Sequence, residues 1–203
     1  SLQGDEAIHE KDCESLRDLV VAAHSQQNVD GIALKYYHFY GKPNLLATGP
    51  RWYRAEARLV RMAGRRVIVP SDAQYLINIS GRRKLSYLRA ICADAHIYHY
   101  GWVRGRNAHA KKVSSVSEFW QEQPAEASLY EQIDPHSLKE FHDTHPAAMQ
   151  PWLDSSANLE FEPDWNHTLT RRERKQRLKS KIEKLTGLDL SCTHFCPVKL
   201  RTK

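Results

Sequence analysis

A short acidic segment near the start of the chain has the residue types that bind a divalent cation. Asp5 and Glu6 follow Gln3 and Gly4 at the end of an apparent strand. Carboxylate oxygens are hard ligands for Mg²⁺ or Mn²⁺, and such an ion can bridge the oxygens of a diphosphate. The alternative interpretation is an acidic turn that leads into a helix, because Asp-Glu pairs are common in proteins.

A second cluster of candidate residues lies where an alternating aromatic segment ends, at His99, Trp102 and Arg104. An imidazole can complete a metal shell, and a guanidinium can pair with a phosphate through two hydrogen bonds. Neighbouring strand positions alternate between faces, so His99 and His96 point in opposite directions and only one is expected in the site. His99 is preferred because it is closer to Gly101. An ordinary half-buried aromatic strand is the alternative.

Two further segments carry candidate site residues. Asp72 follows a short apolar strand, where a carboxylate could accept the proton of an attacking hydroxyl, although a turn-forming Asp has the same pattern. Arg51 and Trp52 could bind a sugar phosphate, with the indole stacked on the sugar ring and the guanidinium on the phosphate. Packing of this segment against a sheet explains the same residues equally well.

Charge favours anionic partners. The 203 residues contain 30 Lys and Arg against 24 Asp and Glu, a net charge of +6. Residues 171–184 hold eight basic and two acidic residues beside a narrow apolar stripe. This pattern is typical of a solvated helix packed on a domain, of a helix on an anionic membrane surface, or of a nucleic-acid contact. Nucleic acid is not expected, because the chain shows no recognisable nucleic-acid-binding motif.

The elements that must position these residues alternate between helix and strand. Apolar spacing and turn residues predict helices over 12–26, from Asn107 to Trp120 and from Thr170 to Gly187, and strands over 31–40, 57–62, 66–69, 75–79, 85–88 and 95–101. We expect the strands 57–62 and 66–69 to pair with each other, and 75–79 to form a hairpin with 85–88. Thr170 and Glu173 have the spacing of a capping box, and Gly187 is placed as the C-terminal cap.

The predicted fold class is therefore α/β, with a mixed sheet flanked by helices over residues 1–120. Residues 121–203 are expected to form a mainly helical appendage that contains a basic amphipathic helix near 171–186. Apolar residues make up 41% of the chain, which is typical of a globular protein. The longest apolar run has five residues, far below the ~20 that span a bilayer, and the scattered cysteines favour reduced thiols and a cytosolic setting.

Taken in order, several motifs resemble bacterial family 2 glycosyltransferases. They are Leu2-Gln3-Gly4-Asp5-Glu6-Ala7-Ile8-His9-Glu10, Tyr36-Tyr37-His38-Phe39-Tyr40-Gly41, Arg51-Trp52-Tyr53-Arg54, Arg58-Leu59-Val60-Arg61, Ile97-Tyr98-His99-Tyr100-Gly101-Trp102-Val103-Arg104 and Thr144-His145-Pro146-Ala147-Ala148-Met149. The resemblance covers most of the chain, and the order of the motifs is more specific than any single one. It implies a GT-A fold that transfers a sugar from a nucleotide-diphosphate donor, usually with inversion and with Mn²⁺ or Mg²⁺ at an Asp-x-Asp motif.

Carried over by position, the resemblance assigns roles to individual residues. Asp5 matches the second aspartate of the metal motif, and Gln3 stands where the first would be. His99 resembles the downstream histidine that binds metal or diphosphate, and Asp72 falls where the catalytic base is expected. The substrate-binding residues implied by the motifs are Gln3, Glu6, Arg51, Trp52, Trp102 and Arg104.

In this family the metal motif follows a nucleoside-binding half, so the resemblance implies a chain that begins inside a longer protein and is inactive by itself. The expected function is transfer of a sugar from a nucleotide-diphosphate sugar to a glycan or lipid-linked acceptor. The expected location is the cytoplasm, at the inner membrane surface. The alternative is a non-catalytic anion-binding module whose basic helix contacts a membrane or nucleic acid.

Overall fold

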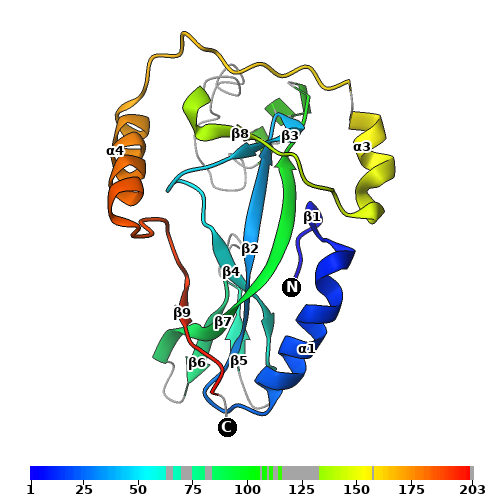
Figure 1. The fold of residues 1–203 in the computed structure, drawn as a ribbon, viewed down its shortest axis with the longest axis vertical. Coiled ribbons are helices and arrows are strands. Elements are labelled where there is room, and N and C mark those ends of the chain that lie inside the picture. The colour runs from blue at the N-terminus through cyan, green and yellow to red at the C-terminus, as the bar shows by residue number, and fades with distance from the viewer. Residues whose placement is uncertain are drawn as a thin grey trace. The chain divides into compact units, whose positions relative to one another are not determined.

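The computed structural model describes residues 1–62, 66–69, 75–80, 84–105, 107–108, 110–111, 114–115, 133–156 and 158–201. The chain divides into two compact units. The first unit comprises Ser1–Tyr37, Tyr53–Tyr98 and Ser191–Lys203, and the second comprises His38–Trp52 and His99–Leu190. Two long neighbouring strands, β2 (Gly31–Tyr40) and β7 (Lys84–Trp102), run from the first unit into the second (Figure 1).

The first unit is built around a mixed sheet. Besides its parts of β2 and β7, it contains β1 (Glu6–Ile8), a 3-10 turn (Glu10–Asp12), α1 (Cys13–His24), β4 (Ala55–Val60), β5 (Arg66–Ile68), β6 (Ile77–Ser80) and β9 (Phe195–Pro197). The strand order is β5-β6-β7-β2, with β4 paired to β2 and with β1 and β9 paired to β7. The pair β7–β9 is parallel, whereas β2–β4, β5–β6 and β6–β7 are antiparallel. The predicted α/β class with a mixed sheet is confirmed.

Strand β2 shows why these residues form a central strand. Ile32 and Leu34 are buried in the same apolar cluster as Leu16 of α1, whereas Ala33 between them belongs to a second buried cluster with Leu88. Alternate side chains of a strand point to opposite faces, so β2 contributes to a core on each side of the sheet. The continuous run of buried residues in β2 follows from this position.

The second unit contains the ends of β2 and β7 together with shorter elements. These are β3 (Lys42–Ala47), a 3-10 turn (Pro135–Ser137), β8 (Leu138–Glu140), a second 3-10 turn (Ala147–Met149), α3 (Gln150–Ser156) and α4 (Arg171–Thr186). Strand β3 pairs antiparallel with β2 and with β8. The unit's apolar cluster contains Tyr40, Ala47, Ile133 and Phe161.

Gly41 makes the turn between β2 and β3. Its φ of 71° lies in the left-handed region, which residues other than glycine adopt only at a cost in conformational energy. A Cβ atom at this position would also overlap the ring of Phe161. The Gly41 N–H donates to the carbonyl oxygen of Trp102 at 3.0 Å, which fixes the end of β2 beside the end of β7 within the second unit.

Several predicted strands differ from the structure. The segment 57–62 does not pair with 66–69 as predicted, because β4 pairs with β2 and β5 pairs with β6. The predicted hairpin of β6 and β7 is confirmed, but 85–88 and 95–101 belong to one continuous strand. In the predicted helix after Asn107, the described residues 107, 108, 110, 111, 114 and 115 are helical. The expected domain boundary at residue 120 lies outside the described residues.

The predicted C-terminal helix is confirmed at both ends. Thr170 and Glu173 form a capping box at the start of α4, and Gly187 ends the helix with a left-handed φ of 71°. Each device satisfies backbone groups that a helix leaves without an internal partner. In the part of the chain that the structure describes, no helix combines the length and apolar character needed to cross a membrane.

Candidate functional site

The turn that carries Asp5 is held by a buried ion pair in the first unit. The Glu6 carboxylate accepts hydrogen bonds from the Tyr36 hydroxyl at 2.8 Å and from the Arg58 guanidinium at 3.0 Å. Its other oxygen accepts from the backbone N–H of Gln3 at 2.9 Å. The side chains of Glu6 and Arg58 are 0% and 2% exposed. Glu6, predicted to bind substrate, therefore anchors the turn, whereas Asp5 is half-buried on the turn itself.

The electrostatics of this cluster favour a charged arginine and a neutral phenol. Burial raises the pKa of Tyr36, an effect that the Arg58 charge partly offsets. Burial alone would lower the pKa of Arg58, but Tyr36 and Glu6 outweigh it and the net shift is upward. The Arg58 Nε–H also donates to the Tyr36 hydroxyl oxygen. The backbone around Asp5 is therefore fixed by charges that stay paired.

In the second unit, the ends of β2 and β7 bring two imidazoles and three larger aromatic rings together. We refer to these side chains as the imidazole–indole cluster; its members are His38, Tyr40, Trp52, His99 and Trp102. The Nδ1 atoms of His38 and His99 lie 3.1 Å apart, and both side chains are buried. The ring of Trp52 lies 5.1 Å from that of His38.

The two indoles of the cluster lie against Tyr40 and against each other. Tyr40 stacks on Trp102 with 5.8 Å between ring centroids, and Trp52 meets Trp102 edge to face at 6.1 Å. Both indoles are half-buried. An indole that is packed on one side and accessible on the other offers an apolar surface with one polar N–H, which suits stacking on a sugar ring.

Two arginines belong to the same unit as the cluster. The Arg51 guanidinium lies 5.6 Å from the centre of the Trp52 ring. Desolvation by the surrounding groups and the nearby Arg172 guanidinium lower the pKa of Arg51, although its side chain is exposed at the surface. The Nε–H of Arg104 donates to the carbonyl oxygen of Gly101 at 2.9 Å, which holds that guanidinium just after the end of β7. These cations can bind an anionic group such as a phosphate.

The predicted site residues are distributed over both units. Gln3, Asp5 and Glu6 belong to the first unit, and Arg51, Trp52, His99, Trp102 and Arg104 belong to the second. Asp72 lies outside the described residues. Within the second unit, contacts through His38 connect His99 with Trp52. His96 belongs to the first unit, where it stacks on Tyr37 at 4.1 Å.

Sequence reasoning did not select His38 and Tyr40. A usable signal was present, because the two residues are separated by one position on an aromatic strand and therefore share a face. Arg58 and Tyr36 each lie in one of the motifs, but their pairing with Glu6 joins residues far apart in the sequence. Such long-range pairs give no spacing pattern along the chain.

A metal site is not preformed by side chains alone in the described parts of the two units. Among these residues, no group of three or more His, Cys, Asp or Glu side chains is placed to hold a metal ion. The Asp5 carboxylate has the oxygen ligands that Mn²⁺ and Mg²⁺ prefer, whereas the imidazole of His99 does not suit Mg²⁺. An ion bound by Asp5 would need further ligands, and the oxygens of a diphosphate substrate are of the right kind.

Searches with protein-family models, among curated proteins and among solved structures found no match to this chain. The resemblance to glycosyltransferases is therefore supported by the sequence motifs alone.

Proposed function

We propose that the protein is a glycosyltransferase of the GT-A type, which transfers a sugar from a nucleotide-diphosphate donor to a glycan or lipid-linked acceptor. The observation that carries the proposal is the imidazole–indole cluster, with half-buried Trp52 and Trp102 and with Arg51 against one indole. Apolar faces of a pyranose stack on indoles, and a guanidinium binds phosphate oxygens. A sugar diphosphate presents both kinds of group in one molecule.

In this proposal the residues have separate roles. Trp52 and Trp102 stack on sugar or base, while Arg51 and Arg104 bind the diphosphate. Glu6 and Arg58 hold the backbone of the turn, which keeps Asp5 in place. Asp5 would be a ligand of a divalent cation, which when bound supplies positive charge to the diphosphate, and His99 keeps the metal-binding or diphosphate-binding role that the resemblance implies. Gln3 is a polar residue next to the Asp5 turn and would contact the substrate. Asp72 keeps the proposed role of catalytic base.

The proposed reaction is a direct displacement with inversion. The acceptor hydroxyl oxygen forms a bond to the anomeric carbon, and the bond from that carbon to the diphosphate oxygen breaks. The proton of the hydroxyl passes to the carboxylate of the base. The nucleoside diphosphate leaves with an additional negative charge, which Arg51 and Arg104 would stabilise. The proposal places this reaction at the cytoplasmic face of the inner membrane.

The first test is ligand-dependent thermal stabilisation of the complete protein with a panel of nucleotide-diphosphate sugars and Mn²⁺. A ligand that binds only the folded state stabilises it by RT ln(1 + [L]/Kd), so the melting temperature keeps rising as the ligand concentration increases above Kd. Asp5→Asn and His99→Ala should abolish the Mn²⁺-dependent part, and Trp102→Ala should weaken binding of the sugar nucleotide. Trp165→Ala serves as the matched control, because this indole is exposed and lies outside the cluster.

The panel also defines the outcome that contradicts the proposal. If no sugar nucleotide stabilises the complete protein, or if Trp102→Ala and Trp165→Ala behave alike, the cluster does not bind this class of ligand. If Mn²⁺-linked stabilisation survives both Asp5→Asn and His99→Ala, the metal assignment is wrong.

A further inference from the structure

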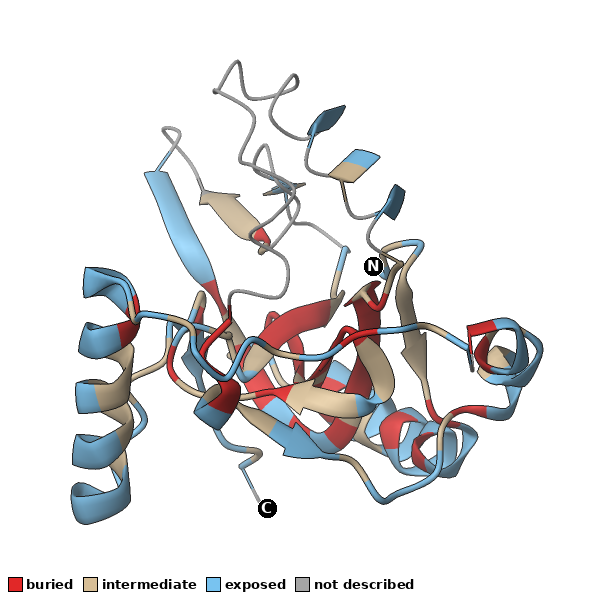
Figure 2. Cartoon of the chain, turned by 90° about the horizontal axis from the view of Figure 1, so that it is seen from above, coloured by how far each residue is buried: buried red, intermediate tan, exposed pale blue. Residues whose placement is uncertain are grey.

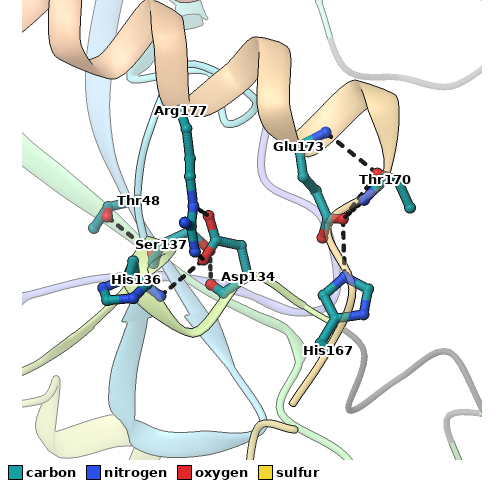
Figure 3. A network of polar contacts seen from close by, with 8 residues as sticks. All are labelled: Thr48, Asp134, His136, Ser137, His167, Thr170, Glu173 and Arg177. Carbon is teal, nitrogen blue, oxygen red and sulfur yellow. Dashed lines mark hydrogen bonds and ion pairs between the residues drawn. The ribbon is translucent and has the colours of Figure 1, made fainter. Parts of the chain in front are cut away.

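Helix α4 is attached to the second unit by one of its faces. The Arg177 guanidinium donates to both carboxylate oxygens of Asp134, at 2.6 and 2.7 Å (Figure 3). In the first turn, buried Glu173 accepts from the Thr170 hydroxyl at 2.8 Å and contacts the His167 ring nitrogen at 2.9 Å. Glu173 and Arg177 are four positions apart and therefore lie on the same side of the helix.

The opposite side of α4 carries an apolar stripe. Leu178, Ile182 and Leu185 are 59%, 39% and 87% exposed, and Figure 2 shows exposed residues along this helix. At 3.6 residues per turn, their average direction lies roughly opposite to that of the less exposed residues Gln176, Ser180 and Glu183, whose side of the helix also includes Glu173. The stripe therefore points away from the rest of the second unit. Leu188, just after the helix, is also exposed.

Positive charge surrounds the stripe. The exposed basic residues whose directions on the helical wheel fall within or beside the stripe are Arg171, Arg174, Lys175 and Lys181. Of the two acidic residues in α4, Glu173 faces the second unit and Glu183 accepts a hydrogen bond from the backbone N–H of Leu190 at 2.7 Å. The outward surface of α4 thus combines leucine and isoleucine side chains with a local excess of cations.

We propose that the outward face of α4 docks on a bilayer surface that contains anionic phospholipid. The leucine and isoleucine side chains would insert between the headgroups, while the surrounding cations contact lipid phosphates. Charge complementarity selects this partner, because a nucleic acid matches the cations but leaves the apolar stripe exposed to water. An anionic bilayer presents an apolar layer directly below a layer of negative charge. This inference goes beyond the proposed function and does not rest on it.

The composition of the surface also sets the expected strength of binding. Three apolar side chains bury little area, so charge attraction provides most of the affinity and added salt screens it. Binding should therefore be reversible, strong at low salt and weak at high salt, and nearly absent on uncharged lipid.

The test is co-sedimentation of the full chain with vesicles of phosphatidylglycerol and phosphatidylcholine in equal parts, and with pure phosphatidylcholine vesicles. The stripe variant carries Leu178→Ser, Ile182→Ser and Leu185→Ser. The charge variant carries Arg171→Gln, Arg174→Gln, Lys175→Gln and Lys181→Gln. We expect each variant to lose at least about tenfold in partition onto the anionic vesicles.

Matched controls use residues of the same kinds on other elements. The apolar control changes exposed Val21, Met62 and Leu85 to Ser, and the charge control changes exposed Arg17, Arg66, Lys139 and Lys199 to Gln. Both controls should bind anionic vesicles within about threefold of the parent chain, since the docking surface is intact. Losses equal to those of the α4 variants would overturn the proposal.

Two further measurements make the result independent of variant stability and of the partner class. Hydrogen exchange of the parent chain should slow across residues 174–188 when anionic vesicles are added, and unchanged exchange there would overturn the proposal. A parallel titration uses single-stranded RNA. The surface would be assigned to nucleic acid instead if the charge variant loses RNA binding, the stripe variant keeps it, and the parent chain does not bind vesicles.

Discussion

The Nδ1 atoms of His38 and His99 lie 3.1 Å apart in the second unit, a hydrogen-bond distance between two atoms of the same type. When both rings are neutral, one Nδ1 must carry the shared hydrogen and the other must accept it. The two histidines are therefore opposite tautomers. Only the ring that donates through Nδ1 has a lone pair on Nε2, so His99 must be that donor if it binds a metal ion through Nε2.

The first prediction is that His38 and His99 differ in tautomer. Long-range ¹H–¹⁵N spectra of the imidazoles should show one ring protonated at Nδ1 and the other at Nε2. His38→Ala removes the acceptor, so His99 should lose its Nδ1–H signal if it is the donor. Two rings protonated only at Nε2 in the parent chain would exclude the hydrogen bond and weaken the assignment of His99 as a ligand.

The second prediction concerns the buried ion pair beneath Asp5. Arg58→Met leaves the Glu6 carboxylate buried without its cation, which should lower the free energy of unfolding by about 3–5 kcal/mol in urea titrations. Replacing both partners, as Arg58→Met with Glu6→Leu, should recover most of that loss because no unpaired charge remains. Arg17→Met on the exposed side of α1 is the control, and an equal cost in both single variants would contradict the pairing.

Local patterns predicted local structure well in this chain. The capping box at Thr170, the β6–β7 hairpin and the span of β2 each depend on residues close in sequence, and all three agree with the structure. The predicted pairing of 57–62 with 66–69 was wrong. The short segment between them has the length of a hairpin loop, but β4 pairs with β2 instead. Strand choice of that kind depends on long-range burial, which no local pattern encodes.

The same distinction holds for the candidate sites. Trp52, Trp102 and His99 could be selected from the sequence because residue types and short spacings carry their chemistry. The hydrogen-bond partner of His99 could not be selected from the sequence, because His38 is 61 positions away. Likewise Glu6 has the type of a ligand, and only the fold shows that Arg58 already occupies its carboxylate. Residue types therefore suggested chemistry, whereas tertiary pairing decides which groups remain available for it.

The third prediction is that Gly41 cannot be replaced. Gly41→Ala places a side chain at positive φ and against the ring of Phe161, so we expect a loss of more than about 2 kcal/mol in unfolding free energy. Adding Phe161→Ala would relieve the overlap but not the backbone strain. Gly4→Ala is the matched control, because a Cβ there meets nothing within 4 Å, and its cost should stay within about 0.5 kcal/mol.

The last prediction concerns the acid stability of the α4 attachment. The hydrogen bond from Arg177 lowers the pKa of Asp134, an effect that the His136 backbone N–H supports and that burial opposes. A carboxyl group with a lowered folded-state pKa stabilises the fold above its unfolded pKa of about 3.8, and this contribution disappears as pH falls through the folded value. The protection of the amides of residues 171–186, taken relative to their slower intrinsic exchange in acid, should therefore fall below about pH 4.

Asp134→Asn separates this effect from general acid unfolding. The variant should show lower protection of the α4 amides already at neutral pH. As the pH falls, its protection should change less than that of the parent chain, because no carboxyl group at position 134 is left to titrate. Asp18→Asn, at an exposed site on α1, should leave exchange in α4 unchanged. Equal acid sensitivity of α4 in the parent chain and in Asp134→Asn would mean that the Asp134–Arg177 pair does not hold the helix, and the outward orientation of its apolar stripe would lose its main support.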